Sequence, residues 1–273
     1  METFRKSDPR PGRIAYEVAG LAWLADAPRG SAPVVPVLRS GGEGIDDQGG
    51  PAWLEEPRLA EVIPTAAAAE DFGRALARTH AAGATHWGAP PPGAPHGSGW
   101  MGLARLPLPV TPEASTPSWG AFYARDRIGP YVGAPAFTRE ERAVLDRLCE
   151  TLSDGVYDHE QPALVRRHGG TTGAARTHGD LWSGNIMWTP DGVTLIDPAA
   201  QGGHAEEDLA ALAVFGCPHL ERIWAAYDEV SPLADGWRDR ISLHQLHMLM
   251  VHCQLFGRGY VSDTLAIARR FAA

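Results

Sequence analysis

The stretch THGDLWSGN, residues 177–185, fits neither an amphipathic helix nor an alternating strand. Within nine positions it places a histidine, an aspartate, a tryptophan, two glycines and an asparagine, with Asp180 and Asn185 five apart. Glycine adopts backbone angles that other residues avoid. We therefore expect Gly179 and Gly184 to turn the two polar side chains toward one point, although an aspartate near an asparagine could also form an ordinary turn.

A second aspartate follows one predicted hairpin later. Residues 186–188 and 193–197 read as two short strands joined by the turn TPDG, and Asp197 ends the second strand. Phosphoryl transfer from ATP requires a carboxylate that orients and deprotonates the acceptor hydroxyl, and oxygen ligands for Mg²⁺. We therefore predict that Asp180 is the catalytic base and that Asn185 and Asp197 are the metal ligands.

Composition limits the class of protein. The chain has 273 residues, 44% of them hydrophobic, which suffices for one large or two small domains. A net charge of −9 argues against binding to nucleic acid or anionic membranes. No signal peptide or membrane-spanning stretch is visible, and the widely spaced Cys149, Cys217 and Cys253 indicate neither disulfides nor a zinc site. We expect a cytoplasmic globular protein.

Hydrophobic spacing predicts two lobes. A short amphipathic helix is expected over residues 12–27, and two short strands over 33–38 and 51–56, with the Gly-rich segment between them as a loop. Residues 1–57 would thus form a small α+β lobe, and residues 58–273 a larger helical lobe.

The larger lobe shows clear helix signals. Thr138 and Glu141 form a capping box at the start of one helix. Residues 86–117, rich in Pro, Gly and Ser, are predicted to be a long surface loop, and residues 166–176 a second loop. Helices are predicted over residues 66–83, 118–132, 138–152, 206–215, 219–230 and 237–256.

Together, HGDLWSGN, LIDPA and GHAEEDLAALAVFG resemble the fructosamine kinase family, whose relatives are the aminoglycoside phosphotransferases and, more distantly, the protein kinases. The resemblance extends to HWGAP, GWMG, WGAFYARDRI and the C-terminal helices, and so covers nearly the whole chain. It implies an α+β, two-lobed, protein-kinase-like fold. It also implies an ATP- and Mg²⁺-dependent kinase that phosphorylates a sugar hydroxyl of a ketosamine, such as a fructosamine or ribulosamine adduct on an amine or a protein.

The resemblance also implies how nucleotide is bound. FRKSD with YEVAGL is similar to the part of the family that holds the ATP lysine and its glutamate partner, so Lys6 would contact the α- and β-phosphates and pair with Glu17. Glu55, Glu56 and Pro57 would form the hinge between the lobes and contact adenine through their backbone.

Further roles concern the acceptor and the support of the loop. Trp182 is bulkier than the residue usual in aminoglycoside kinases, and would either stack on a sugar or pack under the loop. His252 and His247, on the last long helix, are candidates for the acceptor pocket or for the core. His178 would fix the shape of the loop through hydrogen bonds, and Asp208 would brace it.

Two departures from the family keep alternatives open. Only five residues precede Lys6, whereas a Gly-rich hairpin over the phosphates would need about 25 residues. The chain would then start late, or bind nucleotide more loosely. Residues 166–176 are also longer than the family leads us to expect. The alternatives are an aminosugar or aminoglycoside phosphotransferase, and a pseudokinase-like binding or scaffold module.

Overall fold

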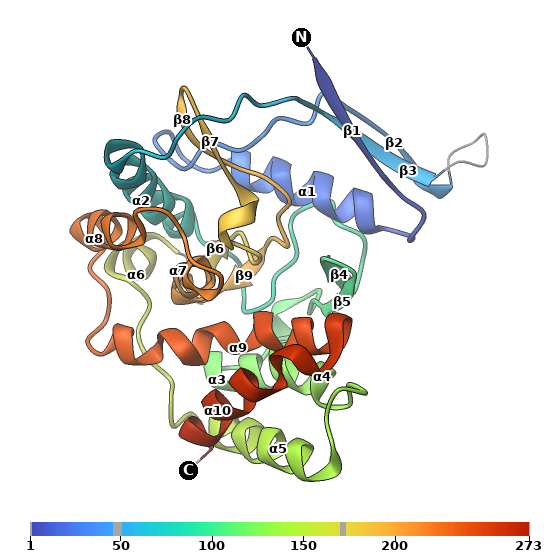
Figure 1. Cartoon of the computed structure of the whole chain (residues 1–273), viewed down its shortest axis with the longest axis vertical. Helices are drawn as coiled ribbons and strands as arrows, with labels where there is room; N and C mark the ends of the chain where they lie inside the picture. Colours follow the sequence, from blue (N-terminus) through green and yellow to red (C-terminus); the bar gives the residue numbers. More distant parts are fainter. Residues whose placement is uncertain (1, 46–50, 170–172, 273) are drawn as a thin grey trace.

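The computed structural model describes residues 2–45, 51–169 and 173–272. At one end of the molecule, a three-stranded antiparallel sheet of order β1-β3-β2 lies next to helix α1 (Arg13–Ala25) (Figure 1). Ile14 of α1 packs on Ala52 and Leu54 in a small buried cluster. The strands are β1 (Thr3–Asp8), β2 (Arg39–Ile45) and β3 (Pro51–Pro57).

The predicted helix over 12–27 and the strand over 51–56 are confirmed, but the strand over 33–38 is wrong. Residues 39–45, expected in a loop, form β2 instead, while 33–38 contribute one isolated bridge, from Val34 to Leu195. Proline lacks a backbone N–H, so Pro33 and Pro36 cannot continue a ladder. The rest of the predicted loop, residues 46–50, lies outside the described residues.

The other end of the molecule is mainly helical, as predicted (Figure 1). All six predicted helices are present, and that over 118–132 consists of α3, a π-helical segment (Tyr123–Ile128) and α4. The helices are α2 (Ala66–Ala81), α3 (Trp119–Phe122), α4 (Gly129–Val132), α5 (Arg139–Ser153), α6 (Ala163–His168), α7 (Ala205–Val214), α8 (Leu220–Val230), α9 (Trp237–Phe256) and α10 (Val261–Phe271).

The capping box at the start of α5 is confirmed. Thr138 N donates to Glu141 Oε2 at 2.8 Å, and Glu141 N donates to Thr138 Oγ1 at 3.3 Å. The helix buries the apolar stripe of its sequence, and this stripe joins the largest buried hydrophobic cluster of the described residues, to which α3, α9 and α10 also contribute. The stripe consists of Val144, Leu145, Leu148 and Leu152.

Residues 86–117 are not the continuous loop predicted. They include a hairpin, β4 (Ser98–Met101) and β5 (Ala104–Pro107), whose turn contains Gly102 at φ 56°. The hairpin is anchored because Trp100 and Leu106 are buried. A Cβ on Gly99 would lie 2.5 Å from the ring of Tyr16, so the glycines taken as loop signals allow close packing here.

Two further antiparallel strand pairs lie near the centre of the molecule. Strands β7 (Ile186–Thr189) and β8 (Gly192–Leu195) confirm the predicted hairpin, and β6 (Ala175–Thr177) pairs with β9 (Gln201–Gly203). The predicted loop over 166–176 is wrong at both ends, which belong to α6 and β6, and residues 170–172 are outside the described part. Among the described helices, none is long and apolar enough to cross a bilayer.

Helices α2 and α8 approach each other closely at a glycine. A Cβ on Gly73 would lie 2.2 Å from the carbonyl oxygen of Ile223, a backbone atom that cannot move aside cheaply. We predict that Gly73→Ala lowers the free energy of unfolding by about 2 kcal/mol, because it overpacks this crossing. Urea denaturation measures the change. Gly133→Ala is the control, since Gly133 has φ −73° and open space around its Cβ. Equal stability of the two variants would contradict the prediction.

Candidate active site

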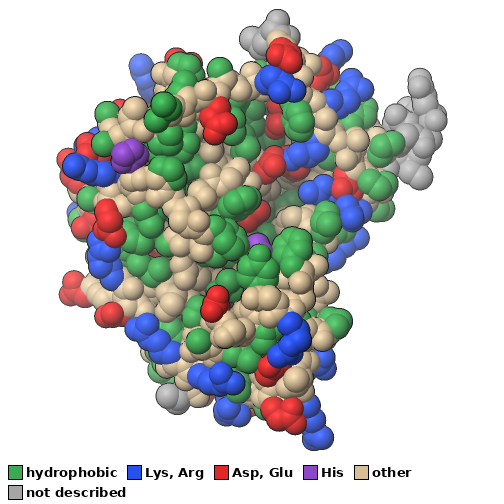
Figure 2. Space-filling model, in the orientation of Figure 1, with side chains coloured by type: hydrophobic (Ala, Val, Ile, Leu, Met, Phe, Trp, Pro, Cys, Tyr) green, Lys and Arg blue, Asp and Glu red, His purple; other side chains and the backbone are tan. Residues whose placement is uncertain are grey.

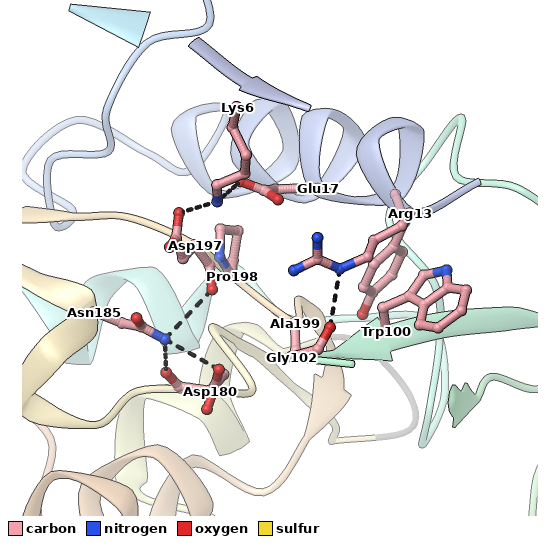
Figure 3. Close-up of a pocket in the computed structure, with 11 residues that line it drawn as sticks. Lys6, Arg13, Glu17, Trp100, Gly102, Asp180, Asn185, Asp197, Pro198 and Ala199 are labelled. Atoms are coloured by element: carbon pink, nitrogen blue, oxygen red, sulfur yellow. Dashed lines mark hydrogen bonds and ion pairs between the residues drawn. The ribbon is translucent and has the colours of Figure 1, made fainter. Parts of the chain in front are cut away.

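The structure brings the three predicted catalytic and metal-binding residues together through one amide group. Asn185 Nδ2 donates to the backbone oxygen of Asp180 at 2.7 Å and to its Oδ2 at 3.1 Å. The same nitrogen lies 3.5 Å from the backbone oxygen of Asp197 (Figure 3). These bonds use the donor end of the amide, so the oxygen end is the one suited to hold a cation.

Backbone conformation sets up this convergence. Gly179 has φ 79°, and a Cβ there would lie 2.1 Å from the oxygen of Ala199, so the prediction for this glycine is confirmed. Gly184 acts differently. Its φ is not positive, but a Cβ would lie 2.2 Å from the ring of Trp182, so glycine is needed for packing. Asp197 has φ 53°, a left-handed conformation that is uncommon outside glycine and is typical of functional sites.

The loop is held from below by a buried carboxylate. Asp208 Oδ2 accepts from His178 N at 2.6 Å and its Oδ1 accepts from Gly179 N at 2.9 Å. His80 Nε2 lies 3.1 Å from Oδ2 of the same residue. The ring of His178 spans the site, accepting from Asp180 N at 3.3 Å and donating from Nε2 to Ile196 O at 2.9 Å. Both residues lie where the predicted supporting roles require, and His80 is a further member.

Lys6 lies above the loop, between two carboxylates. Its Nζ is 2.7 Å from Glu17 Oε1 and 2.5 Å from Asp197 Oδ1 (Figure 3). Burial acts to lower the pKa of Lys6, but the charges of Glu17 and Asp197 outweigh it and raise that pKa. The ammonium group is therefore charged. Strand β1 and helix α1 thus bring Lys6 to the residue predicted to bind metal.

The predicted hinge residues end the central strand β3. Glu55 points toward Arg39, with an ion pair of 2.7 Å, and accepts from Thr3 Oγ1 at 2.7 Å. Glu56 is buried, and burial together with the charge of Glu17 raises its pKa to about 7. Pro57 pairs with Thr3 at the end of the β1–β3 strand pair. None of the three lines the cavity that contains Lys6, so their contact with adenine stays a prediction.

A cavity of about 220 Å³ joins these groups. Figure 2 shows the molecule hollowed on this face, with acidic and basic side chains close together below the N-terminal sheet. Six lining residues were given no individual role from the sequence: Arg13, Tyr16, Trp100, Gly102, Pro198 and Ala199. Arg13 Nε donates to Gly102 O at 2.9 Å and so links α1 to the β4–β5 turn. The GWMG motif was the sequence signal for Trp100 and Gly102.

Trp182 and His252, the two predicted acceptor residues, belong to one aromatic cluster beside the loop. Phe215 lies between them, with ring centroids 5.7 Å from Trp182 and 5.1 Å from His252. Phe256 and Tyr260 extend the cluster on the far side of His252. Phe215 and Phe256 are 44% and 64% exposed, so part of the cluster faces solvent. His252, Phe256 and Tyr260 follow one another at intervals of four residues, and this spacing was a signal available in the sequence. His247, by contrast, is buried, which agrees with the core role.

The site fits the chemistry of a hard cation and a general base. Asn185 and Asp197 both offer oxygen atoms to the cavity, the ligand type that Mg²⁺ prefers. Burial raises the pKa of Asp180 to about 7, while its hydrogen bond from Asn185 acts in the opposite direction. A carboxylate with a pKa near neutrality is well suited to proton transfer.

The arrangement of a small sheet and a helical lobe is the protein-kinase-like fold. This chain is similar in structure to an aminoglycoside phosphotransferase whose crystal structure holds ADP and hygromycin B. The alignment covers 99% of this chain and 87% of the phosphotransferase, with a TM-score of 0.60 at 14% identity. A crystal structure of a candidate fructosamine-3-kinase from Thermobifida fusca is more similar, with a TM-score of 0.77 and 38% identity over 99% of this chain and 85% of that one.

The family model for fructosamine kinase matches residues 17–272, so the chain belongs to this family. A probable ketoamine kinase of Enterococcus faecium is 38% identical over 154 residues, which are 56% of this chain and 53% of the relative. The matched region thus spans about half the length of this curated relative. The predicted family and fold class are confirmed.

Asp208 supplies a test of how the loop is held. Burial acts to raise its pKa, but bonds and charges from His80 and His178 outweigh burial and lower that pKa. An aspartate with a lowered native pKa stabilises the fold above its unfolded pKa of about 3.9, and this contribution is lost as pH falls through the native pKa. We predict that Asp208→Asn lowers the free energy of unfolding at neutral pH by about 3 kcal/mol.

Urea denaturation across pH measures this effect. The difference between the wild type and Asp208→Asn should stay constant from about pH 5 to 8 and shrink below about pH 4. Asp71→Asn, on the exposed face of α2, should change stability by less than about 0.5 kcal/mol. A difference at pH 7 no larger than that of the control would contradict a bracing role for Asp208.

Proposed function

We propose that this protein is an ATP- and Mg²⁺-dependent kinase that phosphorylates a sugar hydroxyl of a ketosamine. The convergence of Lys6, Asp180, Asn185 and Asp197 on one cavity is the observation that carries the proposal. A scaffold needs no such arrangement of one cation and three oxygen-bearing side chains. The ketosamine class is supported by membership of the fructosamine kinase family.

The residues divide the work of phosphoryl transfer. Asp180 orients the acceptor hydroxyl and takes its proton, while the bond from Asn185 Nδ2 holds the carboxylate in place. Lys6 contacts the nucleotide phosphates and retains its ion pair with Glu17. Asn185 and Asp197 would hold Mg²⁺, which would neutralise charge on the transferring phosphoryl group. Gln and Asn cannot replace Asp180, because an amide does not take up a proton at neutral pH.

The wider assignments follow from the same proposal. The acceptor is a free sugar-amine adduct or a glycated amine on a protein, and adenine lies against the backbone of Glu55, Glu56 and Pro57. A net charge of −9 does not favour nucleic acid as a partner, and we propose the cytoplasm as the location.

Release of ADP tests the function. With Mg-ATP and fructoselysine, the wild type should release ADP, and Asp180→Asn should lower kcat by about 10²- to 10⁴-fold, because the base is lost. Asp191→Asn, in the exposed β7–β8 turn, is the control and should keep full activity. A panel of ketosamines, aminosugars and aminoglycosides identifies the acceptor. Higher kcat/KM with an aminoglycoside would overturn the ketosamine assignment, and unchanged turnover in Asp180→Asn would overturn the mechanism.

The aromatic cluster beside the loop supports an acceptor platform. Exposed aromatic rings next to a polar site are typical of ligand-binding surfaces. We predict that Phe215→Ala raises KM for the ketosamine about tenfold, the effect of losing about 1.4 kcal/mol of binding, and leaves KM for ATP unchanged. Steady-state kinetics measure both. Ile63→Ala removes a side chain that is 85% exposed elsewhere and should change neither constant. A parallel rise in KM for ATP would contradict the platform.

A further inference from the structure

Three histidines and a glutamate gather at the start of α7, outside the cavity of the proposed active site. They are His159, His204, Glu206 and His244, and one ligand atom from each lies within 4.8 Å of the others. His159 lies in the connection between α5 and α6, His204 and Glu206 at the beginning of α7, and His244 in the middle of α9. Elements distant in sequence thus meet at one point (Figure 1).

Three of these atoms form a nearly equilateral triangle. His159 Nε2 is 3.1 Å from His244 Nε2, and Glu206 Oε2 is 3.4 Å from the first and 3.3 Å from the second. Ligands 2.0–2.2 Å from a tetrahedral zinc ion lie about 3.3–3.5 Å from one another. The triangle therefore has the dimensions of one face of a zinc coordination tetrahedron.

A hydrogen bond to the backbone directs one ring nitrogen of His159 toward the cluster. His159 Nδ1 lies 2.7 Å from the backbone oxygen of Tyr157, which only accepts, so this nitrogen carries a hydrogen. Nε2 of a neutral His159 then offers a lone pair, and faces the carboxylate oxygen of Glu206. A backbone carbonyl that fixes the tautomer in this way is the usual outer partner of a metal-binding histidine.

Some polar atoms of the cluster lack partners. Nε2 of His204 and Nδ1 of His244 are buried without a hydrogen bond among the described residues. His244 is fully buried at the point where its Nε2 meets His159 and Glu206. Glu206 is anchored by Arg240, whose Nη2 donates to Oε1 at 2.8 Å and whose Nε donates to Oε2 at 3.0 Å.

The surroundings are tightly packed and largely buried. The ring of Trp119 covers the cluster, with its centroid 4.8 Å from His159 and 4.7 Å from His244. Gln161 ties the connection that carries His159 to α7, accepting from Ala205 N at 3.0 Å and donating to Gly203 O at 2.9 Å. A site of this kind is organised before any ligand arrives.

We propose that His159, His244 and Glu206 bind one Zn²⁺ ion, while His204, whose Nδ1 accepts from Glu206 N at 3.2 Å, lies beside them. Imidazole nitrogens with one carboxylate suit zinc rather than Mg²⁺, which prefers oxygen. Because the site is buried and joins three segments, its role is structural. Asp208, which holds the catalytic loop, follows Glu206 by two residues on α7, so the ion stabilises the base of the proposed active site without taking part in the reaction.

Metal binding is measured on the full chain without a histidine tag, after dialysis against a chelator. Titration with Zn²⁺ in excess Mg²⁺, against a chromophoric competitor, should give one ion per chain and raise the melting temperature. Co²⁺ in its place should give the visible absorption bands of a tetrahedral site. His159→Asn, the least buried ligand, should weaken Zn²⁺ binding at least about tenfold. The titration needs neither nucleotide nor acceptor, so it stands apart from the kinase assay.

His96→Asn is the matched control, because His96 is exposed, and it should bind Zn²⁺ like the wild type. If His159→Asn fails to fold, the stoichiometry and the Co²⁺ spectrum of the wild type still decide. Absence of Zn²⁺ binding by the wild type would overturn the proposal. Equal binding by His159→Asn and the wild type would also overturn it.

Discussion

One buried carboxylate connects the helical lobe to the loop that carries the candidate catalytic residue. Asp208 accepts two backbone N–H groups, from His178 and Gly179, and faces His80 of α2. Its position in the first turn of α7 places negative charge where the helix dipole favours it. Asp180 and Asn185 keep their mutual geometry because the backbone before them is held in this way.

A second constraint acts from the small lobe. Lys6 on β1 reaches Asp197, which is 191 positions away in the sequence and sits at the end of the β7–β8 hairpin. The ion pair spans the cavity, and the left-handed backbone of Asp197 directs its side chain there. The two lobes therefore meet through charged groups at the site itself, while Tyr16 of α1 donates to Ala200 O at 2.8 Å beside it.

Most of the fold could be predicted from local patterns. Helices such as α5 were visible because the capping box and the apolar stripe agree. Apart from the strand wrongly predicted over 33–38, the failures share one cause, since glycine-rich segments were interpreted as loops. In β2 and in the β4–β5 hairpin, glycines serve close packing: Gly41 lies against the ring of Trp53, and Gly99 against that of Tyr16. A contact with a distant ring leaves no trace in local composition.

The sequence by itself determined the candidate catalytic loop, the hairpin that delivers Asp197 and the family, because these depend on residue types at short, regular spacings. The tertiary structure decided which distant groups join them. Arg13 and Trp100 at the cavity, Phe215 between Trp182 and His252, and the cluster around Glu206 come together through packing of separate elements. Such convergence depends on how helices and strands pack, so it cannot be predicted from the spacing of residues along a single chain.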